Sequence, residues 1–428
     1  MTAHRRQMKL GAFLWATGHH IAAWRHPKAH VTAGVDIEHY IQLARTAEAA
    51  KFDMIFCEDA AGVREADINI ASQTSRSIGF EPISLLSALA AQTSRIGLVS
   101  TASTSYTEPY GLARTFLSLD HLSGGRAGWN LVTSASHIEA ANFGATGLRP
   151  HADRYERARE FAAVVTALWQ GKLDGVSGPG HDGRSFSVRD PLDLPRSPQG
   201  APVMVQAGAS DEGRDLAART ADVVFTAAQT FEEAKAFYDD LKGRLATYGR
   251  EPNDIKIMPG VAPVVAATEA EATAKYEELQ ELIPDDVGVA LLSSYLSISD
   301  LWRYPIDGPL PELPASEGMQ SRQALVIEQS RRDNLSIRQL ARHFAGARGH
   351  WRVVGTPAQI ADELEARFEG GAADGFNVMP SYFPGELDAF AVLVVPELQR
   401  RGLFRTDYEG STLRDHLGYE TADVSSRL

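Results

Sequence analysis

Eight short apolar runs, separated by stretches with helical spacing, constrain the fold of this chain more than any other feature. Each run has the length of a strand buried on both faces, as in a parallel sheet. The runs are Lys9–Trp15, Asp53–Cys57, Ile96–Thr101, Ala127–Val132, Pro202–Ala207, Asp222–Thr226, Ile255–Val265 and Gly375–Met379. Helical spacing occurs between them at Ile37–Ala50, Arg154–Leu168 and Glu232–Tyr248. This alternation predicts an α/β fold, and eight strands favour a closed (β/α)8 TIM barrel over an open sheet.

Two intervals between the runs are too long for one crossover helix. The first contains a segment rich in Gly, Pro and Asp at 175–200, which predicts an ordered loop or a small hairpin. The second, 266–354, has helical patterns at Glu269–Leu282 and Ser336–Ala345 and a flexible stretch at Pro305–Gly318. We predict one barrel domain over 1–428 with a helical insertion after strand seven and a C-terminal extension over 381–428. The insertion is interpreted as a lid, with an oligomer contact as the alternative.

Charge and composition narrow the class of protein. The 428 residues include 42 Lys and Arg against 55 Asp and Glu, a net charge of −13. Such an acidic surface argues against nucleic acid as a partner. The sequence shows no signal peptide and no run approaching the roughly 20 apolar residues of a membrane span. The single cysteine, Cys57, excludes an intramolecular disulfide, so we expect a cytoplasmic protein with no membrane partner.

Several familiar kinds of site are absent from the sequence. The one GxGxxG match, Gly178–Gly183, lies in the loop-like segment, with no strand before it and no helix after it. There is no GxSxG, CxxC, HExxH or EF-hand pattern, and Cys57 lies in an apolar run where a core role is expected. His19 and His20 are adjacent and would point to opposite sides of an extended chain, so we predict no metal site there.

Polar residues follow several of the predicted strands. In a TIM barrel the carboxyl ends of the strands meet at one face, where the site lies. The residues are Asp59 after run two, Thr104 after run three, Asn130, Thr133 and Ser134 at the end of run four, and Ser210 after run five. Their chemistry predicts a polar ligand rather than a lipid. The alternative is that loops begin with polar residues in any protein.

One helix adds two candidate residues. His151 and Tyr155 are four residues apart, share a helical face and could both donate hydrogen bonds to a phosphate. Ser210 could act as the N-cap of a helix beginning at Asp211, where free backbone N–H groups favour an anion. Asp211 and Glu212 would compete with that anion. The alternative for His151 and Tyr155 is a solvated amphipathic face.

Six segments resemble one family. They are KFDMIFCEDA, STASTSYTEPYGLARTFLSLDHLSGGRAGWNLVTSA, NFG, HADRYERARE, PVMVQAGASDEGRDLAARTADVVF and NVMPSYFPGELDAFAVLVVPELQRRGLFRTDY. These resemble the bacterial-luciferase-like flavin monooxygenases, in the nitrilotriacetate monooxygenase component A branch with the EDTA, dibenzothiophene-sulfone and long-chain alkane monooxygenases. The resemblance covers about residues 9–408.

The resemblance implies a (β/α)8 barrel that binds FMN noncovalently, in a two-component system. A separate NAD(P)H-dependent flavin reductase would supply the reduced FMN, and a C4a-hydroperoxyflavin formed with O2 would oxidise a small organic substrate. Asp59, Thr104, Ser134 and Ala135 match positions around the isoalloxazine. His151, Tyr155 and Ser210 match positions that hold the phosphate. The resemblance also implies a homodimer or a dimer of dimers.

The catalytic group is less defined. His19 or His20 is expected to hydrogen-bond the flavin peroxide or to act as an acid or base on the substrate. Phe13, Trp15 and Trp129 are interpreted as groups that exclude water, with core packing as the alternative. Arg25, Arg64 and Arg76 are candidate partners for an anionic substrate, with solvated surface arginine as the alternative. An F420-dependent oxidoreductase and a flavin-binding barrel without oxygenase activity are the competing functions.

Overall fold

The computed structural model describes residues 6–63, 67–76, 78–171, 180–298, 301–313 and 320–419, with the side chains of 320–322 left out. Eight parallel strands form a closed ring. They are β1 (Lys9–Leu14), β2 (Met54–Cys57), β3 (Gly97–Ser103), β4 (Ala127–Val132), β7 (Val203–Gln206), β8 (Val223–Thr226), β9 (Lys256–Val265) and β11 (Gly375–Val378). The order is β1-β2-β3-β4-β7-β8-β9-β11, and β11 pairs with β1. The expected (β/α)8 barrel is confirmed.

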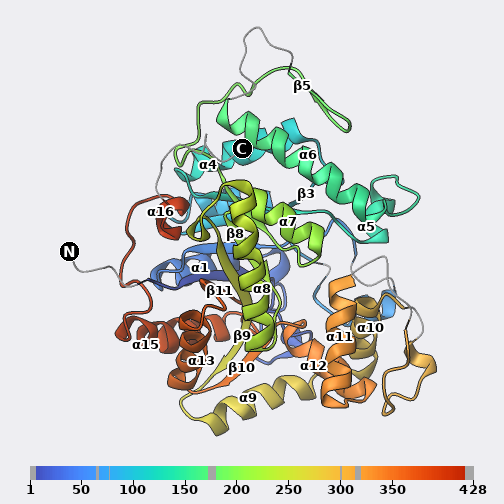
Figure 1. The fold of residues 1–428 in the computed structure, drawn as a ribbon. Helices are drawn as coiled ribbons and strands as arrows, with labels where there is room; N and C mark the ends of the chain where they lie inside the picture. Colours follow the sequence, from blue (N-terminus) through green and yellow to red (C-terminus); the bar gives the residue numbers. More distant parts are fainter. Residues whose placement is uncertain are drawn as a thin grey trace.

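Helices surround the ring of strands (Figure 1). The helices between successive strands are α1 (Ile37–Ala49), α3 (Pro82–Ala90), α4 (Pro109–Ser123), α6 (His151–Gln170), α7 (Asp211–Thr220), α8 (Phe231–Arg244) and α13 (Pro357–Glu369). The short ones are α2 (Ile68–Ala71), α5 (His137–Asn142) and the 3-10 turns η1 (Ala23–Arg25), η2 (Ala33–Val35), η3 (Leu245–Tyr248), η4 (Pro252–Asp254) and η5 (Leu301–Arg303). Capping boxes at Thr230 and Thr356 begin α8 and α13. The three helices predicted from apolar spacing are confirmed.

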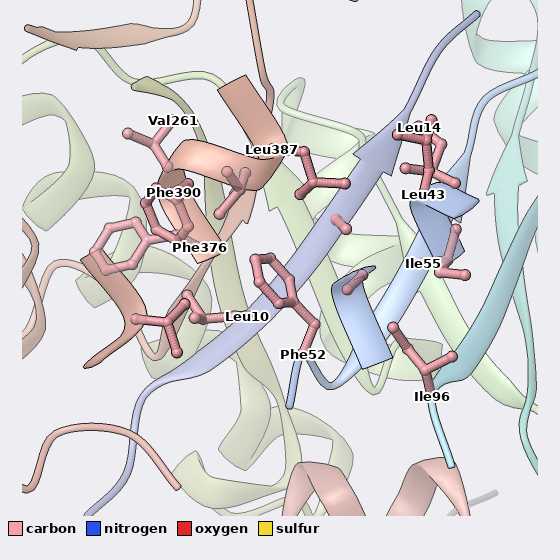
Figure 2. Close-up of a cluster of buried hydrophobic side chains, with 14 of the residues drawn as sticks. Leu10, Leu14, Leu43, Phe52, Ile55, Ile96, Val261, Phe376, Leu387 and Phe390 are labelled. Atoms are coloured by element: carbon pink, nitrogen blue, oxygen red, sulfur yellow. The ribbon is translucent and has the colours of Figure 1, made fainter. Parts of the chain in front are cut away.

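The main core lies between the outer face of the strands and the helices. Alternation along β1 sends Leu10 and Leu14 outward to this core, whereas Phe13 faces the inside of the barrel. Figure 2 shows Leu10 and Leu14 of β1 with Leu43 of α1, Phe376 of β11 and Phe390 from beyond the barrel. The barrel therefore has two apolar layers, and the inner layer forms the floor of the C-terminal face.

The chain between β9 and β11 departs from the prediction in one respect. Its helices are α9 (Glu269–Glu281), α10 (Asp285–Leu296), α11 (Gln320–Asp333) and α12 (Ile337–Ala347), and the first and last match the predicted helical patterns. The segment predicted as a helical insertion also contains a strand, because Trp351–Gly355 forms β10 along the second half of β9. The burial of β10 alternates along the strand, so it does not read as an apolar run.

The insertion has its own apolar core. Leu292, Leu296, Leu340 and Phe344 pack together, and Ile21 from the loop after β1 joins them. Figure 1 shows α10, α11 and α12 grouped at one side of the barrel. A backbone hydrogen bond of 3.0 Å from Ile21 to Ala345 ties this group to the C-terminal face. Residues 314–318 of the predicted flexible stretch lie outside the described residues.

The segment before β7 forms a small hairpin, as predicted. It consists of β5 (His181–Asp182) and β6 (Ser187–Val188). The Glu160 carboxylate of α6 accepts hydrogen bonds from the N–H groups of Ser185 and Phe186 in the turn. This hairpin lies beyond α6, on the side of that helix away from the strands (Figure 1).

The first part of the C-terminal extension packs on the outer face of the strands, and its last helix closes the amino-terminal end of the barrel. It consists of α14 (Gly385–Ala389), the π-helical η6 (Phe390–Val394), α15 (Val395–Arg400) and α16 (Leu413–Leu417). Leu413 packs into space left by Gly97 and Gly128 at the strand starts. Arg414 forms a buried ion pair of 2.8 Å with Asp222, which itself accepts the N–H of Met204. With the amino-terminal face closed in this way, the site must open at the carboxyl ends of the strands.

Candidate active site

The residues predicted to hold a phosphate lie together at the N-termini of α6 and α7. Ser210 is the N-cap of α7, as expected, and its hydroxyl accepts the N–H of Gly213 at 3.1 Å. A Cβ on Gly208 or Gly213 would stand 3.3 or 3.1 Å from the hydroxyl oxygen of Tyr155. The two glycines thus allow the phenol to approach the first turn of α7 closely. This corner combines a phenol, a hydroxyl and helix N–H groups, all able to donate to an anion.

His151 completes this corner, and one of the two competing carboxylates, Asp211, has a cationic partner. Its ring lies 4.8 Å from the Tyr155 ring, and its Nδ1 lies 3.8 Å from the Glu212 carboxylate. Asp211 accepts a hydrogen bond of 2.7 Å from Arg244, which lowers the pKa of Asp211. The charge of Asp211 therefore has a partner of its own, which reduces its competition with a phosphate at the α7 N-terminus.

A second polar edge follows β3 and β4. The hydroxyl oxygens of Ser103 and Ser134 are 2.7 Å apart, and Ser134 has a left-handed backbone with φ of 42°. Thr104 is buried and donates to the carbonyl of Val132 at 3.3 Å. Ala135 is half-buried beside Ser134. This edge offers hydroxyl oxygens and backbone groups to a planar polar ligand.

Asp59 lies exposed at the end of β2, where it lines a cavity of about 130 Å³ with Glu58 and Trp15. Thr104 and Ser134 follow the next two strands of the ring. The predicted cofactor residues thus form two sets. His151, Tyr155 and Ser210 form one, which we call the phosphate corner, and the residues at the strand ends form the other. This division suits an elongated polar ligand with one anionic end.

His19 is held neutral by its surroundings. It follows Gly18, whose φ of 126° allows the chain to pass against the backbone of Ser381. Nε2 of His19 donates to the Phe13 carbonyl at 2.8 Å, and Nδ1 accepts from Arg348 at 3.4 Å. Burial and the nearby charge of Arg348 lower the pKa of His19 to about 3. With both nitrogens bonded, His19 suits a group that positions Arg348 better than one that exchanges a proton.

His20 is buried but bonded on one side only. Its Nδ1 accepts the N–H of Ala22 at 3.2 Å, so its proton is on Nε2. Among the residues described, Nε2 has no hydrogen-bond partner. Burial, with a contribution from the charge of Arg352, lowers the pKa of His20 to about 3. His20 is therefore a buried, neutral imidazole whose Nε2–H is a donor.

The sequence reasoning missed an ion pair at the mouth. Arg348 follows α12 with φ of 54°, an uncommon backbone for a residue with a side chain. Its Nη2 lies 3.1 Å from a carboxylate oxygen of Glu58, and its guanidinium stacks 3.9 Å from the Trp15 ring centroid. Glu58 comes two residues after the inward-facing Phe56 and adjoins the predicted Asp59, but no local pattern in the sequence links it to a residue 290 positions away.

The three aromatic residues differ in position. Phe13 lies inside the barrel against Phe56 and Phe225, and Trp15 lines the mouth. Trp129 lies outside the ring of strands, and its indole N–H donates to Ala102 at 3.0 Å. A water-excluding role for Trp129 is therefore wrong, because alternation along β4 turns it outward to the helices. His350, also missed from the sequence, stacks on Phe225 with ring centroids 5.0 Å apart.

The described residues show neither a metal centre nor a membrane-spanning helix. Within the described ranges, no group of three or more His, Cys, Asp and Glu side chains is arranged to hold a metal ion. None of the helices in those ranges combines the length and apolar character needed to cross a bilayer. Arg64, one candidate for an anionic substrate, lies outside the described residues. Arg25 stacks on Trp24, 4.8 Å from its ring centroid, whereas Arg76 lines the mouth.

Comparison with known proteins identifies the family. A model of the luciferase-like monooxygenases matches residues 13–374. Nitrilotriacetate monooxygenase component A of Aminobacter aminovorans is 49% identical, with 96% of each chain covered. N-acetyl-S-(2-succino)cysteine monooxygenase of Bacillus subtilis strain 168 is 47% identical, with 98% of each chain covered. The structure of a riboflavin lyase with modified FMN and riboflavin is 30% identical, covers 97% of this chain and 96% of its own, and has a TM-score of 0.86.

The resemblance noted in the sequence is confirmed by these similarities, which extend over nearly the whole chain. The family is flavin-dependent, and this chain has the barrel fold of its solved relatives. The chain belongs to the luciferase-like monooxygenase family.

Proposed function

We propose that this monooxygenase binds FMN noncovalently, takes it in reduced form from a separate NAD(P)H-dependent flavin reductase, and inserts one oxygen atom of O2 into a small organic substrate. The observation that carries the proposal is the corner formed by His151, Tyr155 and Ser210 at two helix N-termini. This corner would bind the anionic end of the ligand, and the strand-end residues would bind its polar body.

The phosphate corner suits FMN for electrostatic reasons. Backbone N–H groups in the first turn of α7 carry partial positive charge and point outward from the helix. The Tyr155 hydroxyl stands beside that turn because Gly208 and Gly213 leave it room. A charged acceptor makes hydrogen bonds roughly twice as strong as a neutral one, so this corner would favour a phosphate over a hydroxyl.

The remaining assigned residues would surround the isoalloxazine. Thr104, Ser134 and Ala135 would contact one edge, and Asp59 would lie at the end of β2. When bound, the reduced flavin supplies the reaction with O2. The chain would orient the substrate beside it and keep water out, with Phe13, Phe56 and Phe225 as an apolar floor.

Two observations support a separate reductase: the name of one relative and the single barrel that the described residues form. The Aminobacter relative is named component A, which marks it as one part of a larger system. One (β/α)8 barrel with an insertion and a C-terminal extension accounts for the described residues, and no dinucleotide-binding motif follows a strand. The NAD(P)H chemistry would then take place on a separate protein.

An isotope experiment tests the activity. Chemically reduced FMN and the protein are mixed with ¹⁸O2 and either nitrilotriacetate or N-acetyl-S-(2-succino)cysteine, and the products are analysed by mass spectrometry. We expect one ¹⁸O atom in an organic product and less hydrogen peroxide than without substrate. Unlabelled substrates with unchanged peroxide would favour the flavin-binding barrel without oxygenase activity. Turnover with reduced F420 but not with FMN would favour the alternative cofactor.

A further inference from the structure

Helix α5 contacts the loops that carry the predicted isoalloxazine residues. Ser136 is its N-cap and directly follows Ser134 and Ala135 in the loop after β4. The loop after β2, which carries Asp59, reaches the same helix at Ala61. The function proposed above gives α5 no role of its own, although the helix lies at the centre of these contacts.

Two side chains of α5 hold both backbone polar groups of one residue in the β2 loop. The N–H of Ala61 donates to Oε1 of Glu139 at 2.9 Å, and Nδ2 of Asn142 donates to the carbonyl of Ala61 at 2.8 Å. Gly62 lies against the same helix, where a Cβ would stand 3.4 Å from the backbone nitrogen of Glu139. Because Asp59 is only two residues before Ala61, these contacts restrict where Asp59 lies.

The loop after β3 is joined to α5 by an aromatic stack. Tyr106, two residues after Thr104, stacks on Phe143 at the end of α5, with ring centroids 4.6 Å apart and an angle of 3° between the ring planes. Burial raises the pKa of Tyr106, and the nearby negative charge of Glu139 adds to that effect. All three loops with predicted ring-binding residues therefore meet at α5.

Glu139 is the strongest of these contacts because it is a buried carboxylate. It is 8% exposed, whereas Asn142 is exposed. A hydrogen bond to an ionised acceptor is roughly twice as strong as one between neutral groups, and it gains strength away from water. The backbone of Glu139 is fixed as well, because its N–H donates to the Ser136 hydroxyl at 3.3 Å. A rigid acceptor of this kind limits the movement of the loop after β2.

We propose that Glu139 is a positioning residue for the flavin ring: by holding the N–H of Ala61, it sets the position of Asp59 relative to Ser134 and Ala135. The inference rests on the proposed function and adds to it a residue that acts through the β2 loop rather than by touching the cofactor. The phosphate corner is built from α6 and α7, so loss of this contact should weaken binding of the ring and leave the contribution of the phosphate unchanged.

Two measurements test this role. In the flavin-free protein, hydrogen–deuterium exchange of peptides that cover Ala61 should be at least about tenfold faster in Glu139→Ala than in the parent chain. Fluorescence titration should then show that Glu139→Ala weakens FMN and riboflavin by the same factor, at least about fivefold. Glu139→Gln keeps an amide oxygen that can accept the N–H of Ala61, so it should retain slow exchange and most of the affinity.

Two further variants on the same helix sharpen the test. Asn142→Ala removes the contact with the Ala61 carbonyl at an exposed position, so its folding does not depend on a buried group. It should weaken both flavins equally, by at least about twofold. His137→Ala, also at an exposed position of α5, should change neither affinity.

The outcomes distinguish this inference from the proposed function. Faster exchange at Ala61 with unchanged flavin affinities in Glu139→Ala and Asn142→Ala would make the contact purely structural and overturn the inference. A loss confined to FMN would also overturn it, because the effect would then lie at the phosphate. Failure of the unaltered protein to bind either flavin would contradict the proposed function, and the inference with it.

Discussion

Tyr155 is the residue on which the cofactor assignment depends most directly. Its hydroxyl lies at the first turn of α7, where it can donate to a phosphate. We predict that Tyr155→Phe lowers FMN affinity by about 1–2 kcal/mol, or roughly 5- to 30-fold, because a hydrogen bond to a charged acceptor is lost. Riboflavin affinity should not change. Tyr110→Phe, which removes an exposed hydroxyl on α4, is the matched control. Equal losses in both variants, measured by fluorescence titration, would contradict the prediction.

The sequence predicted those site residues whose position follows from a local rule, such as helix capping or helical spacing. Ser210 is an N-cap because a small polar residue precedes a helix, and His151 and Tyr155 share a face because they are four apart. Arg348 and Glu58 follow no such rule. Their contact depends on where the insertion returns to the barrel, which only the tertiary structure gives.

At the scale of elements, α16 acts as a plug in the amino-terminal end of the barrel. Leu413 is fully buried against Gly97 and Gly128. We predict that Leu413→Ala lowers the free energy of unfolding by about 2–5 kcal/mol, because it leaves a cavity in the barrel. Leu122→Ala on α4, where the side chain is 70% exposed, should change it by less than about 0.5 kcal/mol. Urea denaturation measures both, and similar values would show that α16 does not support the barrel.

Apolar spacing predicts only part of the secondary structure of the insertion. It predicted α9 and α12, but it missed α10, α11 and strand β10. The burial of β10 alternates from residue to residue, so its sequence is not a continuous apolar run. The lid remains a prediction, since residues 314–319 lie outside the described ones. Protease should cut preferentially between Tyr304 and Gln323, and FMN with substrate should slow that cleavage. Cleavage unaffected by ligands would favour the oligomer contact.

At the scale of the whole molecule, buried ion pairs make the fold sensitive to acid. Burial raises the pKa of Asp222, but the charge and hydrogen bonds of Arg414 outweigh that effect and hold the pKa below its usual value of 3.8. A carboxyl with a depressed pKa stabilises the fold above its unfolded pKa, and that stability is lost as pH falls through the folded value. Asp222→Asn should be destabilised at pH 7, and its deficit relative to the parent chain should shrink below about pH 4. A deficit that is independent of pH would contradict this role.

The assembly remains a prediction from the family resemblance. We expect a homodimer or a dimer of dimers, and sedimentation at micromolar concentration should give species larger than the 46.5 kDa chain. A single species of that mass would contradict it. A cytoplasmic location likewise remains an expectation.

The central claim is that the α6–α7 corner holds the phosphate of FMN, and comparison of FMN with riboflavin tests it most directly, because the two differ only in that group. Each flavin is titrated into the purified protein at fixed pH and ionic strength. We predict that FMN binds at least about tenfold more tightly than riboflavin, and that His151→Gln lowers this affinity ratio by weakening FMN binding alone. Equal affinity of the unaltered protein for the two flavins would contradict it.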